Sequence, residues 1–273
     1  MNQNEQMVYT FLSDYAERSK WITNHVSAYE KVYFMHPSLQ LLIGMAGYFY
    51  EHGSCFRVLL DFSPFSYGFT IHPGYGVDSS TGLSVSGYAS LRQLPDIPDE
   101  NRNSITGECK RYTKAQLKKH LQCNINCLEE HFLPEVMSYT SLEDYFQFLL
   151  ELDDSHYRIR IPSPSIEGFY LSFQLNKLTE AASSILLLYK KNPYTYYYKF
   201  EKIIDPEGDF VSSELNRIES LKMNRWDIND RQTEFLVQVI NEKRSELMKE
   251  LDMRLLRSKE ACQQLFESAA ANN

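Results

Sequence analysis

The sequence lacks the segments that would carry a chain into a membrane or out of the cell. Its opening stretch, MNQNEQMVYTFLSDY, has no basic segment followed by an apolar one, so we expect no secretory signal. No apolar run reaches the length that a bilayer requires; the nearest, LQLLIGMAGYFYEHG, is short and ends in charge. These absences predict a cytoplasmic protein with no membrane contact.

Positive charge is also scarce. The 273 residues include 28 lysines and arginines against 36 aspartates and glutamates, which gives a net charge of −8. Such a chain has no overall field to attract nucleic acid or other polyanions, although a local basic patch remains open. The odd number of cysteines predicts reduced thiols in the cytosol. They are Cys55, Cys109, Cys123, Cys127 and Cys262.

Catalytic and metal-binding motifs are few. Cys123 and Cys127 lie four residues apart near His120, but a structural zinc site needs four ligands at knuckle-like spacing. Glu108 and Lys110 have the E-x-K spacing of metal-dependent nucleases, in which carboxylates hold Mg²⁺ and the lysine stabilises developing charge. The surroundings of this pair are polar and loop-like rather than apolar strands. We therefore predict no metal, no cofactor and no catalytic residue.

The N-terminal half contains the patterns of both helices and strands. Residues 5–20 predict a helix whose apolar face comprises Val8, Phe11, Leu12 and Tyr15. The segment GYFYEHGSCFRVLLDF predicts a hairpin that turns at His52-Gly53-Ser54. YGFTIHPGYG and GLSVSGYASLRQL predict a third and a fourth strand. We expect an antiparallel meander with one face on a core.

Two capped helices are expected after the meander. Thr113 and Gln116 predict a capping box ahead of an apolar stripe that runs to Phe132. Thr140 and Glu143 predict a second box ahead of a stripe over residues 142–150. Residues 1–152 are therefore predicted to form one α+β domain.

Four segments within residues 30–152 occur in a characteristic order: FYEHGSCFRVLLDF, GFTIHPGYG, ASLRQLP and HFLPEVMSYTSLEDYFQFLLE. In this order they resemble a family of uncharacterised bacterial α+β domains found among toxin-immunity and phage-defence genes. The resemblance covers a hairpin, an F-x-I-x-x-G strand, an arginine strand and a helix that ends in Leu-Pro. It implies an α+β fold and a setting in bacterial conflict, and it implies no activity and no site.

Residues 153–273 are predicted to form a mostly helical region. SFQLNKLTEAASSILLLYKK predicts one helix, and a long final helix is expected from near Asn229 to about Phe266. Apolar residues in this last helix recur at a spacing of eleven, as at Leu236 and Leu247, which keeps their stripe nearly straight. The predicted fold class is thus α+β, with an N-terminal antiparallel meander and flanking helices and a helical C-terminal half ending in a long helix.

The stripe of the final helix is the first candidate binding surface. Ile240, Leu247, Leu251 and Leu255 span several turns, and a helix this long is difficult for a small domain to cover. We expect these residues to bind a protein partner or a second copy of the chain. Two alternatives remain open at this point, a helix that lies along its own domain and a frayed, solvated end.

The second candidate surface is the segment YKKNPYTYYYKF. Tyr194, Tyr196 and Tyr198 alternate with other residues as in a strand, and lysines lie on both sides. Tyrosines interleaved with lysines can stack bases and hold phosphates, whereas a tyrosine face can also contact a protein or simply belong to an amphipathic strand.

These observations predict a non-catalytic protein that binds another protein, as an immunity-type or accessory factor in a bacterial conflict or defence system. The alternative is a component that binds or processes nucleic acid through the tyrosine- and lysine-rich segment.

Overall fold

A computed structural model describes most of the chain, in two compact units. The described residues are 3–19, 21–23, 31–36, 38–50, 55–72, 76–77, 81–95, 112–154, 166–191, 204, 210–221 and 225–271. The first unit comprises residues 1–65, 69–160 and 259–273, and the second comprises 66–68 and 161–258. The first unit therefore includes the last segment of the chain, residues 259–273. The predicted division into residues 1–152 and 153–273 places this segment in the other domain.

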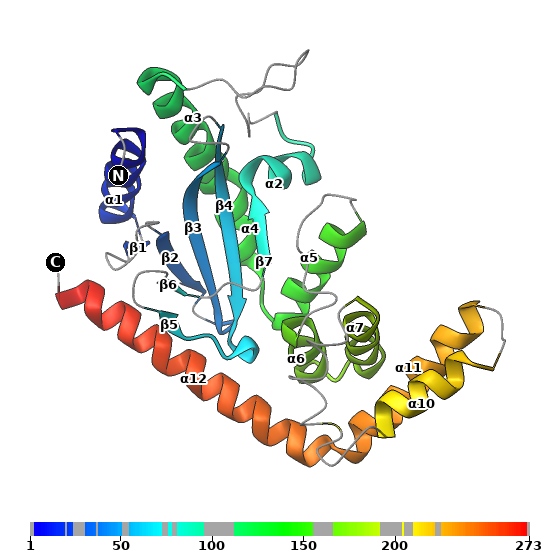
Figure 1. Cartoon of the computed structure of the whole chain (residues 1–273). Coiled ribbons are helices and arrows are strands. Elements are labelled where there is room, and N and C mark those ends of the chain that lie inside the picture. The colour runs from blue at the N-terminus through cyan, green and yellow to red at the C-terminus, as the bar shows by residue number, and fades with distance from the viewer. Residues whose placement is uncertain are drawn as a thin grey trace. The chain divides into compact units, whose positions relative to one another are not determined.

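The first unit contains a five-stranded antiparallel sheet in the order β1-β2-β3-β4-β7 (Figure 1). Its strands are β1 (Ile22–Thr23), β2 (Lys31–His36), β3 (Leu41–Tyr50), β4 (Cys55–Pro64) and β7 (Thr81–Ser84). Strands β3 and β4 pair along their whole length, with Tyr50 opposite Cys55. The hairpin expected from the sequence is confirmed, although its turn, residues 51–54, lies outside the described residues.

Two predicted strands differ from the observed structure. YGFTIHPGYG forms β5 (Ile71–His72) and β6 (Gly76–Val77), which pair with each other in a separate two-stranded sheet. GLSVSGYASLRQL was expected to be one strand, but the strand β7 ends at Ser84 and the helix α2 (Val85–Leu91) follows. The hydroxyl of Ser84 accepts a hydrogen bond from the N–H of Gly87 at 3.0 Å. This N-cap starts the helix, so the strand ends here although the strand-like alternation of residues continues in the sequence.

Four further helices belong to the first unit. They are α1 (Gln3–Arg18), α3 (Lys114–Cys127), α4 (Leu133–Ser138) and α5 (Leu142–Asp154). The predicted capping box of α3 is confirmed: Gln116 N–H donates to Thr113 Oγ1 at 3.2 Å, and Thr113 N–H donates to Gln116 Oε1 at 3.0 Å. At α5 the capping carboxylate is Asp144 rather than the predicted Glu143, because Asp144 accepts from the N–H groups of Thr140 and Ser141.

Aromatic side chains connect the helices to the sheet in this unit. Phe62 on β4 has its ring centroid 5.8 Å from that of Phe132, which lies in the π-helical turn Leu128–Phe132 between α3 and α4. The rings of Tyr145 and Phe148 on α5 lie 5.9 and 5.8 Å from the same phenylalanine. All four side chains are buried. This cluster fixes α4 and α5 against the strand that also forms the predicted hairpin.

The second unit is helical, as expected. Its helices are α6 (Ile166–Gln174), α7 (Leu178–Lys191), α10 (Phe210–Glu219), α11 (Arg225–Glu242) and the first part of α12 (Arg244–Ala271). The single helix expected over residues 172–191 is broken, because Asn176 has a φ of 59° in the left-handed region. The expected final helix is also divided, at Lys243, into α11 and the 28-residue α12.

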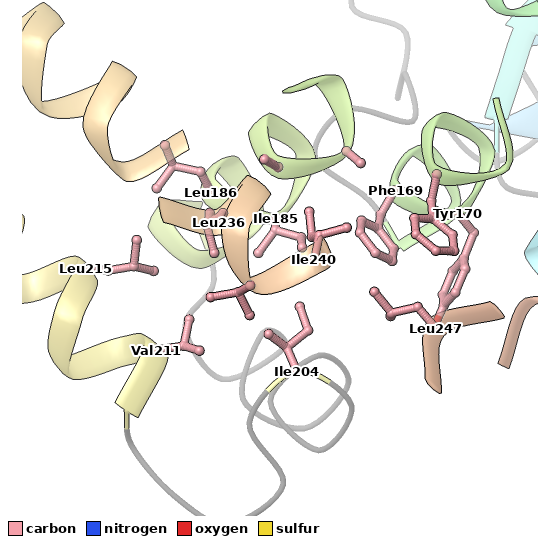
Figure 2. Packing of buried hydrophobic residues seen from close by; sticks show 14 of the residues in the cluster. Phe169, Tyr170, Ile185, Leu186, Ile204, Val211, Leu215, Leu236, Ile240 and Leu247 are labelled. Atoms are coloured by element: carbon pink, nitrogen blue, oxygen red, sulfur yellow. The ribbon is translucent and has the colours of Figure 1, made fainter. Parts of the chain in front are cut away.

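One hydrophobic cluster holds these helices together. Figure 2 shows Phe169 and Tyr170 from α6, Ile185 from α7, Ile240 from α11 and Leu247 from α12 turned toward a common interior. Each of these five side chains is fully buried. Burial of a leucine or isoleucine of this kind contributes roughly 1.5–3 kcal/mol, so the cluster is the main source of stability for the second unit.

Candidate functional site

The predicted binding stripe of the final helix lies inside the second unit. Ile240 and Leu247 are fully buried and Leu251 is 2% exposed, and all three belong to the cluster with α6 and α7. Leu255 is partly buried and packs against the same cluster. Helices of the same chain cover this stripe. Of the possibilities left open by the sequence, the structure has the one in which the helix lies along its own domain, and not the expected contact with a partner. A partner that binds α12 must contact a different side of the helix.

Several other candidate residues fall outside the described part of the chain. The tyrosine-rich segment, with Tyr194, Tyr196 and Tyr198, lies in the range 192–203, and the E-x-K pair Glu108 and Lys110 lies in the range 96–111. The nucleic-acid alternative and the interpretation of the E-x-K pair therefore remain sequence-based.

The cysteine and histidine side chains of α3 do not form a metal site. His120 and Cys127 are buried, while His131 is exposed on the following π-helical turn. In the described ranges, no three His, Cys, Asp or Glu side chains are grouped so that they could hold a metal ion. Burial, with a contribution from Glu130, raises the pKa of Cys127 to about 11, so this side chain is a protonated thiol near neutral pH. A protonated thiol is a poor nucleophile and a poor ligand.

His120 has an unusual environment within this group. Its ring lies 5.5 Å from that of Phe56 and 5.6 Å from that of Tyr112. Its Nε2 atom is buried without a hydrogen-bond partner among the described residues. Burial penalises the imidazolium form and lowers the pKa of His120 to about 4.

This environment predicts an acid-sensitive fold. The unfolded chain binds a proton at His120 near pH 6.5, whereas the folded chain resists protonation down to about pH 4. Stability therefore falls as the pH drops through this interval, by about 3 kcal/mol from this one group, and the effect is absent above it. We expect His120→Leu to remove that part of the acid sensitivity, measured as the difference in urea unfolding free energy between pH 7.5 and pH 4.5. His131→Leu, at an exposed position, is the control and should keep the wild-type difference; an unchanged difference in His120→Leu would contradict the assignment.

A charged network joins three helices of the first unit. The carboxylate of Glu135 on α4 accepts hydrogen bonds from Tyr88 Oη at 2.7 Å, Arg92 Nε at 3.0 Å and Tyr139 Oη at 3.1 Å. Arg92 also pairs with Glu151 on α5 at 2.7 Å. Burial raises the pKa of Glu135, but the hydrogen bonds from Arg92 and Tyr88 outweigh it, and the net pKa is lowered. The carboxylate is fully occupied, which makes the network a structural tie between α2, α4 and α5.

A hollow of about 380 Å³ lies elsewhere in the first unit. It is lined by Met35, His36, Gln40, Phe65, Lys259, Cys262, Gln263 and Phe266. The His36 ring is engaged on both sides, with Nε2 3.1 Å from the carbonyl oxygen of Val136 and Nδ1 accepting from the N–H of Ser38 at 3.3 Å. Burial raises the pKa of Cys262 to about 12. The lining therefore contains neither a free imidazole nor a thiolate that could serve as a base or nucleophile.

The exposed side of α12 offers a better candidate for binding. Met253 is 53% exposed and Leu256 is 56% exposed, although both are large apolar side chains. Together with the exposed Lys249 and Glu260 they follow the spacing 4-3-4, which places them in one stripe along the helix. We call these four residues the outward stripe. At 3.6 residues per turn, this stripe lies on the opposite side of α12 from the buried Leu247 and Leu251.

Charged residues border the outward stripe on both sides. Asp252 and Lys259 lie along one edge, and Glu250 and Arg257 lie along the other. Glu250 pairs with Arg254 of its own helix at 3.0 Å. The remaining charges form no ion pair with any residue that the structure describes; they are Lys249, Asp252, Arg257, Lys259 and Glu260.

Sequence reasoning missed the outward stripe for a definable reason. Only two of its four residues are apolar, so the leucine-rich stripe on the other side dominates the hydrophobic pattern. The signal that could have identified it is the 4-3-4 spacing combined with the arrangement of charges about the middle of the stripe.

Comparisons with known proteins give no relative for this chain. No family model, no curated protein and no solved structure matches it. Among the helices within the described ranges, none combines the length and the apolar character needed to cross a bilayer.

Proposed function

We propose that this chain is a non-catalytic protein that binds a protein partner through the outward stripe of α12, as an immunity-type or accessory factor in a bacterial conflict or defence system. The observation that carries the proposal is the exposure of Met253 and Leu256 one turn apart on a long, well-formed helix. Paired exposed apolar residues with a charged border are typical of the centre and rim of a protein interface.

Two further observations support the setting of this proposal. Of the described cysteines, Cys123, Cys127 and Cys262 carry free thiols, as expected for a protein that acts in a reducing cytoplasm. The segments that resemble immunity- and defence-associated domains include the hairpin of β3 and β4 and the helix α5. These elements belong to the first unit. The resemblance thus supports the biological setting of the proposal, and the outward stripe supports the binding surface.

The proposal predicts that charge placed in the outward stripe abolishes binding without unfolding the protein. We expect the double variant Met253→Asp/Leu256→Asp to lose at least a hundredfold in affinity for a captured partner, because two apolar contacts are replaced by solvated carboxylates. Its melting temperature should stay close to that of the wild type, since both side chains are already exposed. The measurement is affinity capture with tagged protein, followed by titration of each captured protein.

Leu187→Asp is the matched control for this experiment. Leu187 is an exposed leucine on α7, 42% accessible, and it lies away from α12 in the sequence. This variant should capture the same proteins as the wild type. Capture that survives in the double variant, or a wild type that captures no protein and does not bind itself, would show that the outward stripe is not a binding surface.

A further inference from the structure

The charges around the outward stripe are arranged so that α12 complements itself when turned end to end. The middle of the stripe falls between Arg254 and Leu255. Lys249 and Glu260 lie at equal distances from this point and have opposite charge, and Met253 and Leu256 lie at equal distances and are both apolar. The outward stripe is therefore symmetric in its apolar residues and antisymmetric in its charges.

We infer that the outward stripe binds a second copy of this chain, with the two α12 helices antiparallel. In that arrangement the residues before the middle of one stripe face those after the middle of the other. Met253 then packs against Leu256 of the second copy, and Lys249 faces Glu260 of the second copy. Each contact occurs twice because the pair has twofold symmetry. The inference rests on the proposed function, since it names the partner of the same surface.

The edges of the stripe agree with this pairing. When two helices pack antiparallel, each edge of one helix meets the same edge of the other. Asp252 then meets Lys259 of the second copy along one edge, and Arg257 meets Glu250 of the second copy along the other. All of these edge pairs have opposite charge. Most of the charges involved have no ion-pair partner among the described residues of their own chain, so self-pairing gives them one.

A parallel arrangement of the same two helices is disfavoured by the same residues. Each residue of the stripe would meet its own equivalent, which places Lys249 against Lys249 and Glu260 against Glu260. Like charges in direct contact are unfavourable, and they offset what this arrangement gains from the two apolar layers and from Asp252 facing Arg257 of the second copy at the edges. The charge pattern thus selects one orientation. Because the apolar centre is small, the pair belongs to the weak, transient class of interfaces.

A charge-exchange series tests the inference directly. Sedimentation of the wild type from about 5 µM to about 500 µM is expected to show a reversible monomer–dimer equilibrium. Lys249→Glu and Glu260→Lys, each alone, place like charges together at two symmetric positions and should weaken the dimer about tenfold or more. The double variant Lys249→Glu/Glu260→Lys exchanges the charges and should restore the wild-type equilibrium. Circular dichroism melting checks that all variants fold, as their exposed positions lead us to expect.

The outcomes separate this inference from the proposed function. A wild type that stays monomeric throughout the concentration range overturns the inference, and the proposed function still stands if Met253→Asp/Leu256→Asp abolishes the capture of another protein. A dimer that the double exchange fails to restore overturns the antiparallel pairing. If a different protein is the partner, Lys249→Glu and Glu260→Lys each alter its binding, and the double variant Lys249→Glu/Glu260→Lys does not restore that binding. This result would also overturn self-pairing.

Discussion

Leu251→Asp is expected to unfold the second unit. The leucine side chain is 2% exposed and packs in the cluster that includes Phe169, Tyr170 and Ile185. Truncation of such a leucine to alanine costs about 2–5 kcal/mol, and a buried carboxylate without a partner costs more. Natural domains are stable by roughly 5–15 kcal/mol, so the variant retains little or none of this margin. Loss of helical circular dichroism and a large fall in the urea midpoint are the measurements.

Leu256→Asp is the matched control on the same helix. The two leucines lie five residues apart, but Leu256 is 56% exposed and outside the cluster. This variant should change the unfolding free energy by no more than about 0.5 kcal/mol. If Leu251→Asp instead left the unfolding midpoint unchanged and only removed a larger species in light scattering, the buried stripe would be an interface between chains.

Glu135→Ala is expected to destabilise the first unit by about 2–4 kcal/mol. The substitution removes the carboxylate that accepts hydrogen bonds from Tyr88, Arg92 and Tyr139, so these three donors lose that partner. Glu135→Gln keeps one oxygen acceptor and should lose roughly half as much. Glu130→Ala, at an exposed position on the preceding turn, serves as the control and should be close to neutral. Urea unfolding of the three variants gives the change in unfolding free energy for each. Equal changes in Glu135→Ala and Glu130→Ala would show that the network does not stabilise the fold.

Local signals allowed much of the fold to be predicted from the sequence. A capping box depends on two residues three positions apart, and Thr113 with Gln116 therefore identified the start of α3 correctly. The β3–β4 hairpin was similarly local. Where two local signals compete, prediction fails: the alternation around Val85 is typical of a strand, but the hydroxyl of Ser84 caps a helix at that point. At Asn176 the change of direction has a left-handed residue and no glycine or proline to reveal it.

The candidate site was less accessible to sequence reasoning than the fold. The apolar stripe of Leu247 and Leu251 indicates that these residues are buried, but it does not say what covers them. That depends on α6 and α7, which lie far away in the sequence and contribute Phe169 and Ile185 to the same cluster. The packing of Leu247 and Leu251 determines which side of α12 is left exposed, so the outward stripe is a property of the folded chain rather than of the sequence pattern.

The division of the chain into units has a consequence for the order of events during translation. Residues 259–273 belong to the first unit and line its hollow together with Met35 and Phe65, yet residues 161–258 separate them from the rest of that unit. At a synthesis rate of about 5–20 residues per second, the ribosome takes roughly 5–20 s to make the intervening segment. During this interval the nascent first unit lacks the residues of α12 that line its hollow, so this unit can be completed only after the whole of the second unit has been synthesised.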